Sequence, residues 1–367
     1  MSQDIKKIYL EDFHVNHGGK LINFSNYMMP INYNTGIINE HLHVRKSVGL
    51  FDVSHMGQIL IPKTKQNIFS LEKFIPLALE NLKLGNSYYS FILNENGGII
   101  DDIIISLMNI NNQESYYIVY NSSRKNIDEK IFKSILVNYS ILENNSLIAI
   151  QGPFSKEALN FLKIDYPSSF MKNISVKFYN EIILISRTGY TGEDGFEISI
   201  PNSIIEKFIN DLIKFENIKL CGLGSRDSLR LEAGLSLYGN DLNEEITPIE
   251  AKFKWAIDKD RLLNSSLNGY QILNSQINDG VKKIKVGLKL LSNSIIRSKM
   301  KLFDLEDNEI GLITSGGFSP SLKVSIGIGY INSEYRYDKV KSVIRKSMEN
   351  INIVNLPFIP HKYKRGD

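Results

Sequence analysis

The sequence predicts an α+β fold that ends in a small all-β unit. Strand-length apolar runs and amphipathic helical patterns are mixed through residues 1–279, whereas the later chain shows strand patterns separated by turn residues. A chain of 367 residues exceeds the usual size of one domain, so two or three domains are expected. We therefore expect a boundary near residues 276–283, which separates the mixed region from residues 280–367.

In the mixed region, short apolar runs at residues 118–120 and 182–185 have the length of buried strands. Residues 204–215 show the spacing of an amphipathic helix. Its apolar positions are Ile205, Phe208, Ile209 and Leu212. A second helix is expected to begin at Ser225, a favourable N-cap, and to end at Gly234, which adopts the left-handed conformation at little cost.

In the all-β unit, residues 285–290 alternate with the period of two that is typical of a strand. Residues 310–313, 324–331 and 340–345 are further strand candidates, each bounded by turn residues.

Composition excludes several classes of protein. The 43% hydrophobic and 23% charged content is that of a globular chain, and a net charge of +3 gives no indication of nucleic-acid binding. The single cysteine, Cys221, excludes an internal disulfide and a cysteine metal cluster, and it suits a reducing compartment. The sequence holds no apolar run of membrane-spanning length and no apolar stretch typical of a signal peptide near Met1, so we expect a cytoplasmic protein without a membrane partner.

Two adjacent carboxylates, Asp101 and Asp102, follow an Asn-Gly-Gly turn signal in an otherwise apolar strand. Side chains alternate across a strand, so these two should point to opposite faces, both of which are apolar. A carboxylate in an apolar wall is costly unless it is paired or acts as an acid or base. The alternative is an edge strand with both carboxylates solvated near the turn. The spacing does not choose between the two aspartates.

Three glycines spaced three residues apart lie within residues 187–198, which indicates a backbone that turns tightly or lies close to a ligand. The acidic side chains of Glu193 and Asp194 argue against a phosphate and favour a flat, neutral ligand. Glu197 in the following strand could accept two parallel hydrogen bonds from a ring N–H and a neighbouring amine, the pattern on the edge of a pterin. The alternative is a hairpin with solvated acids.

Arg226 and Arg230 share a face of the helix expected from Ser225. Arg226 lies in the first turn, where a cation opposes the helix dipole, so an anionic partner is indicated. The alternative is an ordinary surface arginine.

Motifs of other enzyme classes are missing from the sequence. The histidines lack the H-E-x-x-H spacing, so we expect no metal site. Asp52, Ser54 and His55 are too close in sequence to form a nucleophilic triad easily, and there is no G-x-S-x-G elbow. The G-x-G pairs lack the third glycine of a dinucleotide-binding fingerprint.

Taken in order, several motifs resemble the glycine cleavage T-protein family over nearly the whole chain. They occupy residues 10–14, 17–20, 51–56, 94–102, 189–195, 226–234, 237–241, 247–250, 314–322 and 358–363. Examples are Phe-Asp-Val-Ser-His-Met at residues 51–56 and Phe-Ile-Pro-His-Lys-Tyr at residues 358–363. Each motif alone is weak, but the ordered set is highly specific.

The resemblance implies three domains around a central channel, with two interleaved α+β subdomains in residues 1–279 and a β-barrel-like domain in residues 280–367. It also implies that Asp102 is the family's essential carboxylate and that Glu197 is its pterin-binding glutamate. The further positions that match the family's folate-binding or substrate-binding residues are Tyr89, Asn121, Tyr190, Arg226 and Tyr363.

The activity implied by the resemblance is the transfer of a one-carbon unit from S-aminomethyl-dihydrolipoyl H-protein to tetrahydrofolate, a co-substrate. The products would be 5,10-methylenetetrahydrofolate, ammonia and dihydrolipoyl H-protein. The lipoylated H-protein would be the direct partner, and the P-protein and L-protein of the glycine cleavage system would be functional partners.

Two related functions are alternatives. A folate-dependent demethylase of the superfamily would share the folate site, but the motifs at residues 226–234 and 247–250 favour the aminomethyltransferase. A non-catalytic folate-binding protein, such as the iron–sulfur assembly helpers, would use a lone cysteine in a Lys-Gly-Cys context. Here Cys221 follows Lys219 and Leu220, and the retained Asp102 favours catalysis.

Overall fold

Two sheets, a hairpin and a closed barrel form the β-structure of the chain, which a computed structural model describes for residues 5–263 and 266–366. The six-stranded sheet has the order β10 (Asn173–Phe178), β11 (Glu181–Ser186), β12 (Gly195–Pro201), β9 (Asn145–Gln151), β3 (Val48–Asp52) and β13 (Ile218–Leu220). The five-stranded sheet has the order β5 (Ser87–Leu93), β6 (Ile99–Ile110), β7 (Gln113–Tyr120), β4 (Gly57–Pro62) and β8 (Ser140–Ile141). The hairpin joins β1 (Lys20–Phe24) to β2 (Tyr27–Asn32).

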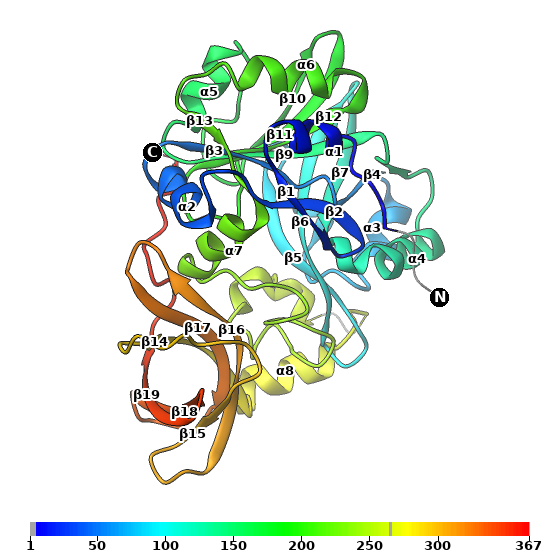
Figure 1. Cartoon of the computed structure of the whole chain (residues 1–367). Coiled ribbons are helices and arrows are strands. Elements are labelled where there is room, and N and C mark those ends of the chain that lie inside the picture. The colour runs from blue at the N-terminus through cyan, green and yellow to red at the C-terminus, as the bar shows by residue number, and fades with distance from the viewer. Residues whose placement is uncertain (1–4, 264–265, 367) are drawn as a thin grey trace.

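The barrel closes in the order β14 (Lys283–Leu290), β17 (Val324–Asn332), β16 (Glu309–Ser319), β15 (Lys301–Phe303), β18 (Lys339–Ile344) and β19 (Ser347–Val354). Figure 1 shows it below the two sheets, in orange and red. The strands expected in the all-β unit are all present, and the α+β class with a C-terminal barrel is confirmed. The central channel and the division into domains stay predictions.

Helices surround the sheets. They are α1 (Glu11–Asn16), α2 (Ile37–Lys46), α3 (Lys65–Leu71), α4 (Lys125–Ile135), α5 (Ser155–Phe161), α6 (Asn202–Leu212), α7 (Leu223–Glu232) and α8 (Tyr270–Asp279), with short 3₁₀ turns that include η2 (Ser122–Arg124) and η3 (Lys254–Ala256). Within the described residues, no helix has both the length and the apolar character that a membrane crossing requires.

The amphipathic helix predicted at residues 204–215 is α6, and its four predicted apolar positions are buried in the core of the six-stranded sheet. The helix ends at Leu212, earlier than predicted. The backbone N–H of Phe215 donates to the carbonyl of Leu212, which turns the chain toward β13.

The helix that carries the predicted arginines is α7, but the prediction of Ser225 as its N-cap is wrong. The helix begins at Leu223, so Ser225 lies inside the first turn. The buried carboxylate of Glu40, from α2, takes the capping role by accepting from the backbone N–H of Gly222 at 2.9 Å. Its negative charge also suits a helix N-terminus. At the other end Gly234 has a φ of +66°, which confirms the predicted stop.

The chain leaves the barrel after β19 and returns to the six-stranded sheet (Figure 1). The backbone N–H of Ile359 donates to the carbonyl of Glu232 at 3.1 Å, and that of Lys362 donates to Gly192 at 2.8 Å. The C-terminal segment therefore ties the barrel, α7 and the loop before β12 together.

Candidate functional site

Asp101 and Asp102 lie on β6, between β5 and β7 in the five-stranded sheet. The alternative of a solvated edge strand is therefore wrong. Asp101 is 0% exposed and Asp102 is half-buried. The register between β5 and β6 shifts beside Asp101, where Ile92 pairs with Asp101 but Leu93 pairs with Ile99. Such a bulge re-aims the neighbouring side chains.

Both carboxylates reach Asn121, although strand alternation predicts opposite faces for them. Asn121 follows β7, and its Nδ2 lies 2.8 Å from Oδ1 of Asp101 and 2.9 Å from Oδ1 of Asp102. Its backbone N–H donates to Oδ2 of Asp101 at 2.8 Å. The hydroxyl of Tyr89, from β5, donates to Oδ2 of Asp102 at 3.1 Å. Asp102 thus contacts two predicted site residues, Tyr89 and Asn121.

Burial raises the pKa of Asp102 above its ordinary value of 3.8, because a low-polarity environment disfavours the charged form. Hydrogen bonds from Tyr89 and Asn121, and the positive charge of Lys285, act in the opposite direction. Among the described residues, no Lys, Arg or His forms an ion pair with Asp102. The carboxylate is held by neutral donors and is not neutralised by a paired cation.

Glu197 lies on β12 of the six-stranded sheet, where it pairs with Ala149. The hydroxyl of Thr188 donates to its Oε2 at 2.7 Å and so fixes one carboxylate oxygen. The charge of Glu197 raises the pKa of Arg226, which burial lowers, and also contributes to the raised pKa of Tyr363. Glu197, Arg226 and Tyr363 therefore share one electrostatic environment.

Tyr190 connects this environment to Asp102. The guanidinium carbon of Arg226 lies 4.9 Å from the centre of the Tyr190 ring, and the Tyr190 hydroxyl donates to the carbonyl of Ser236 at 2.5 Å. Burial raises the pKa of Tyr190, and Asp102 contributes to the increase. Tyr190 is therefore common to both predicted carboxylates. Asp102 acts on it directly through its charge, and Glu197 acts on Arg226, which lies over the Tyr190 ring.

Arg226 has an unused donor. Its Nη1 is buried and has no hydrogen-bond partner among the described atoms. A buried donor without an acceptor is costly, so this atom is available for an acceptor on a bound molecule. The alternative of an ordinary surface arginine is therefore wrong.

Tyr363 lies in the C-terminal segment and stacks on Phe170, with ring centres 3.9 Å apart and planes 1° apart. Burial raises the pKa of Tyr363 to about 12, so its hydroxyl stays a donor at neutral pH. Its position depends on the return of the chain from the barrel.

Lys285 is a residue of the site that sequence reasoning missed. It lies on β14, is 4% exposed, and its Nζ donates to Oγ of Ser236 at 3.0 Å. The same ammonium lies 3.8 Å from the centre of the Phe253 ring. Burial lowers the pKa of Lys285 to about 8, while Asp241 and Asp102 favour its charged form. No signal in the alternating strand separates this lysine from the half-buried Lys283 and Lys289.

Aromatic rings adjoin Asp102 through Tyr89. The Tyr89 ring stacks on Trp255 at 5.8 Å between centres and lies edge-on to Phe253 at 5.4 Å. Trp255 is 69% exposed, which is unusual for so large an apolar side chain. An apolar wall with one exposed ring therefore lies next to the carboxylate.

The glycines of residues 187–198 serve protein packing. A Cβ at Gly189 or Gly195 would lie 1.9 or 2.5 Å from side-chain atoms of Gln151, and Gly192 has a φ of +78°. The positive φ of Gly192 confirms the predicted tight turn, and Gly189 and Gly195 lie against the Gln151 side chain.

The acids of the same loop are paired, so the alternative of solvated acids is wrong. Glu193 is buried and lies 3.0 Å from Nη1 of Arg45. Asp194 lies 2.5 Å from Nη2 of Arg187.

A second cluster of charges joins α7 to the barrel. Arg230 pairs with Asp241 at 2.9 Å. Glu232 pairs with Arg45 at 2.8 Å and with His41 at 3.0 Å. Burial alone would raise the pKa of Glu232, but hydrogen bonds from His41 and Ser319 and the charge of Arg45 lower it to about 2. We use the name joint cluster for Arg230, Asp241, Glu232, Arg45, His41 and Ser319.

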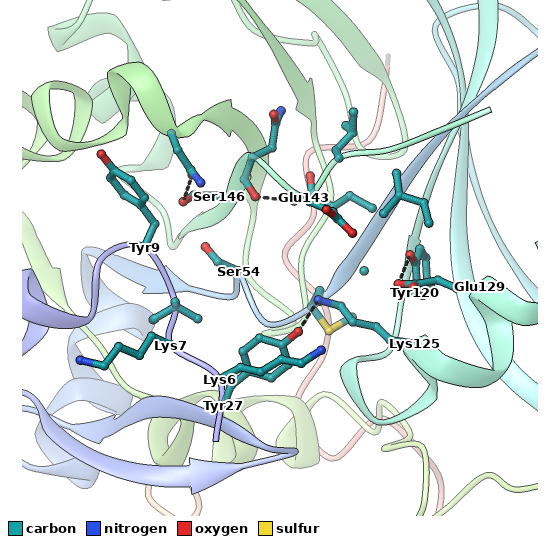
Figure 2. A pocket seen from close by; sticks show the side chains of 18 of the residues that line it. Lys6, Lys7, Tyr9, Tyr27, Ser54, Tyr120, Lys125, Glu129, Glu143 and Ser146 are labelled. Carbon is teal, nitrogen blue, oxygen red and sulfur yellow. Dashed lines mark hydrogen bonds between the residues drawn. The ribbon is translucent and has the colours of Figure 1, made fainter. Parts of the chain in front are cut away.

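A cavity of about 470 Å³ lies elsewhere, between the N-terminal segment, β2, β4 and α4. Figure 2 shows Lys125 beside Tyr27, whose hydroxyl lies 3.0 Å from Nζ of Lys125. Glu129 and Glu143 also line it, so its charges are of both signs and indicate no single class of ligand. None of the predicted site residues lines this cavity.

Comparisons with known proteins agree over the whole chain. Family models described as "GCVT N-terminal domain" and "Glycine cleavage T-protein C-terminal barrel domain" match residues 10–261 and 283–359. The chain is 38% identical to "Aminomethyltransferase, mitochondrial" of Dictyostelium discoideum, over 99% of this chain and 95% of that protein. It is 36% identical to "Aminomethyltransferase" of Thermoanaerobacter pseudethanolicus, over 99% of this chain and 100% of that protein.

A solved structure gives the same result. The crystal structure of glycine cleavage system aminomethyltransferase T from Bartonella henselae superimposes with a TM-score of 0.91 at 33% identity, covering 99% of this chain and 100% of that one. The chain therefore belongs to the aminomethyltransferase (T-protein) family of the glycine cleavage system and is an enzyme.

Proposed function

We propose that the chain transfers the one-carbon unit of S-aminomethyl-dihydrolipoyl H-protein to tetrahydrofolate. The carbon exchanges its bonds to sulfur and to the amine nitrogen for bonds to N5 and N10 of the folate. The two hydrogens that N5 and N10 lose go to the departing sulfur and amine. The products are 5,10-methylenetetrahydrofolate, dihydrolipoyl H-protein and ammonia, so atoms and charge balance without an oxidant or a metal.

The observation that carries the proposal is Asp102, a half-buried carboxylate that Tyr89 and Asn121 hold and that pairs with no cation of residues 5–263 and 266–366. As ammonia departs, the transferred carbon gains positive charge. A fixed negative charge in a low-polarity site stabilises such a cation more strongly than water does. We therefore assign Asp102 to the side of the pocket that would hold N5 and N10 of the folate, where its negative charge would stabilise the transferred carbon.

Binding and orientation are assigned to the groups around Tyr190. Glu197 would accept the ring N–H and the neighbouring amine of the pterin, which is a charge-assisted pair of hydrogen bonds. The unused Nη1 of Arg226 offers a donor for an acceptor on the substrate. Tyr89, Asn121 and Tyr363 complete the proposed set of substrate-binding residues, and positioning of the two substrates supplies much of the rate.

The non-catalytic alternative depends on a reactive cysteine, and Cys221 does not suit that role. Its side chain is buried against Gly49, and burial raises the pKa of the thiol well above its ordinary value. The thiolate is the reactive form of cysteine, so this environment suppresses reactivity.

The test is ammonia release from aminomethylated, lipoylated H-protein, measured with and without tetrahydrofolate. We expect rapid release that depends on both components, and formation of 5,10-methylenetetrahydrofolate in equal amount. No release with both components present contradicts the proposal. Folate-dependent turnover of a methylamine or sulfonium donor in place of H-protein would instead identify the demethylase.

The proposal includes P-protein and L-protein as functional partners and a cytoplasmic location. Relatives from Dictyostelium discoideum and Pisum sativum are named mitochondrial. Fractionation of source cells with an antibody against the chain would decide the location.

A further inference from the structure

A third carboxyl group, that of Asp128, lies behind the aspartates of β6. Asp128 is in the first turn of α4 and is 0% exposed. Both of its side-chain oxygens are buried, and no N–H or O–H of another described residue donates to either of them. Its carboxyl group lies against that of Asp101, and the interaction between them raises the pKa of Asp128 and lowers that of Asp101. A buried carboxylate without a donor is among the costliest arrangements in a protein.

The donors around these carboxyl groups are unevenly distributed. Oδ1 and Oδ2 of Asp101 each accept a hydrogen bond at 2.8 Å from Asn121. Asp102 accepts from Tyr89 and Asn121. An oxygen that accepts a hydrogen bond needs a free lone pair, so these contacts favour the ionised form of both residues. Asp128 accepts no hydrogen bond from the described residues. Of the three carboxyl groups, it is therefore the one that protonation costs least.

Among the described residues, no cation forms an ion pair with Asp128, although charged and titratable groups face it from several elements. They are Asp101 from β6, Tyr120 from β7, Arg124 from η2, Glu129 from α4 and Tyr238 from the segment after α7. The cation in this set, Arg124, favours the ionised form of Asp128 by its charge, but its ion pair is with Glu244 at 2.5 Å and it lies over the ring of Tyr238. Burial and the neighbouring charge of Asp101 raise the pKa of Asp128 far above its ordinary value, although the α4 N-terminus favours an anion.

We propose that Asp128 is a positioning residue that carries a proton at neutral pH and donates it in a hydrogen bond to Asp101. Asp101 then remains an ionised acceptor for Asn121, and Asn121 holds the carboxylate of Asp102 in place. The inference rests on the proposed function only in its last link, the effect on Asp102. The protonated Asp128 itself is independent of the activity.

The first test is infrared spectroscopy of the full chain labelled with ¹³C at the aspartate carboxyl groups. At pH 8 we expect a carbonyl band of a protonated carboxylic acid, which ionised carboxylates lack. The band should be absent from Asp128→Asn and retained in Asp211→Asn, a matched control in which the lost carboxylate is paired with Lys214 at the surface. A wild-type chain without the band, or a band that survives in Asp128→Asn, overturns the proposal.

The second test separates positioning from a merely structural role. The amide of Asp128→Asn can still donate to Asp101, so kcat and the pH profile should stay close to wild type. Asp128→Leu keeps the branched shape of the side chain, though it is larger, and has no donor, so we expect kcat to fall about 10-fold with little change in KM for tetrahydrofolate. Without the donor the pKa of Asp101 rises, so the pH below which turnover is lost should move upward in Asp128→Leu alone.

An unchanged acid limb in Asp128→Leu overturns the link to Asp102. An acid limb that shifts equally in both variants also overturns it, because the amide should rescue. A chain that releases no ammonia under any condition contradicts the proposed function and leaves the infrared band unaffected, so the two failures are distinguishable.

Discussion

Two arginines on α7, one helical turn apart, show two uses of a buried charge. Arg230 is fully paired, with Asp227 and Asp241 each at 2.9 Å. Arg226 is half-buried, yet its Nη1 has no partner in the part of the chain that the structure describes. The joint cluster and Asp102 show the same contrast. Glu232 accepts from His41, Arg45 and Ser319, whereas no described cation forms an ion pair with Asp102.

The difference teaches how to distinguish structural from functional charges in this fold. Charges in the joint cluster satisfy one another, so they hold α7 against the barrel. Charges in the candidate site are left incomplete, so a substrate can complete them. If this is correct, substitutions in the joint cluster should reduce stability, and substitutions in the site should reduce turnover or binding.

The largest effect is expected for Glu232→Ala. Removing the carboxylate leaves His41 and Arg45 buried without it, so the free energy of unfolding should fall by about 3–5 kcal/mol. Urea denaturation at pH 7 measures this, with the exposed Glu245→Ala as control. The pKa of Glu232 is about 2 when folded and 4.5 in its ordinary state, so its contribution should be complete above pH 4.5 and be lost as the pH falls toward 2. Equal stability of both variants would break the comparison.

Asp102→Asn should leave the fold intact and lower kcat roughly 10²–10³-fold, because it removes the charge that stabilises the transition state. The affinity for tetrahydrofolate should change much less. Ammonia release gives kcat and calorimetry gives the dissociation constant. Near-normal turnover would remove Asp102 from the mechanism.

Glu197→Gln should weaken tetrahydrofolate binding about 10-fold to 100-fold, the usual cost of a lost charge-assisted hydrogen bond. Titration calorimetry measures this directly. If the affinity is unchanged, another group binds the edge of the pterin.

Lys285→Met should have a smaller effect that depends on pH. The ammonium of Lys285 favours the ionised form of Asp102, so its removal should move the acid limb of the kcat profile upward by roughly 0.5–1 pH unit. The pKa of Lys285 is about 8, so wild-type turnover should also decline above pH 8 through loss of the ammonium, a decline that the variant lacks. Identical pH profiles would mean that Lys285 has only a structural role, like the charges of the joint cluster.

Cys221→Ser should have the smallest effect on turnover, because the buried thiol lies outside the proposed site. Ammonia release within about twofold of wild type is expected, since substitutions away from a functional feature have small effects. Loss of folate-dependent activity would revive the cysteine-dependent alternative.

Local patterns were sufficient for much of the fold. The spacing of Ile205, Phe208 and Leu212 located α6, and the alternation after Lys283 located the barrel strands, because periodicity depends only on which face is buried. The cap of α7 was missed because the capping carboxylate, Glu40, comes from a distant helix.

In the candidate site too, local patterns were informative and contacts between distant elements were not predictable. The apolar surroundings of Asp101 and Asp102 indicated a buried carboxylate, but which of the two serves the reaction came from the family resemblance. Asp128 and Lys285 gave no signal, since each becomes unusual only through contacts made by folding. The contact of both aspartates with Asn121 could not be predicted from a period of two either, because Asn121 follows a different strand.

The returning C-terminal segment has a consequence for how the enzyme matures. Tyr363 reaches its stacking partner only after the chain has crossed back from the barrel. A polypeptide released a few codons early would contain both sheets and the whole barrel, yet would lack one wall of the place where the pterin is expected. Such a product would also leave uncovered the Phe170 ring face on which Tyr363 stacks, and an assay of folate retention would test for the missing wall.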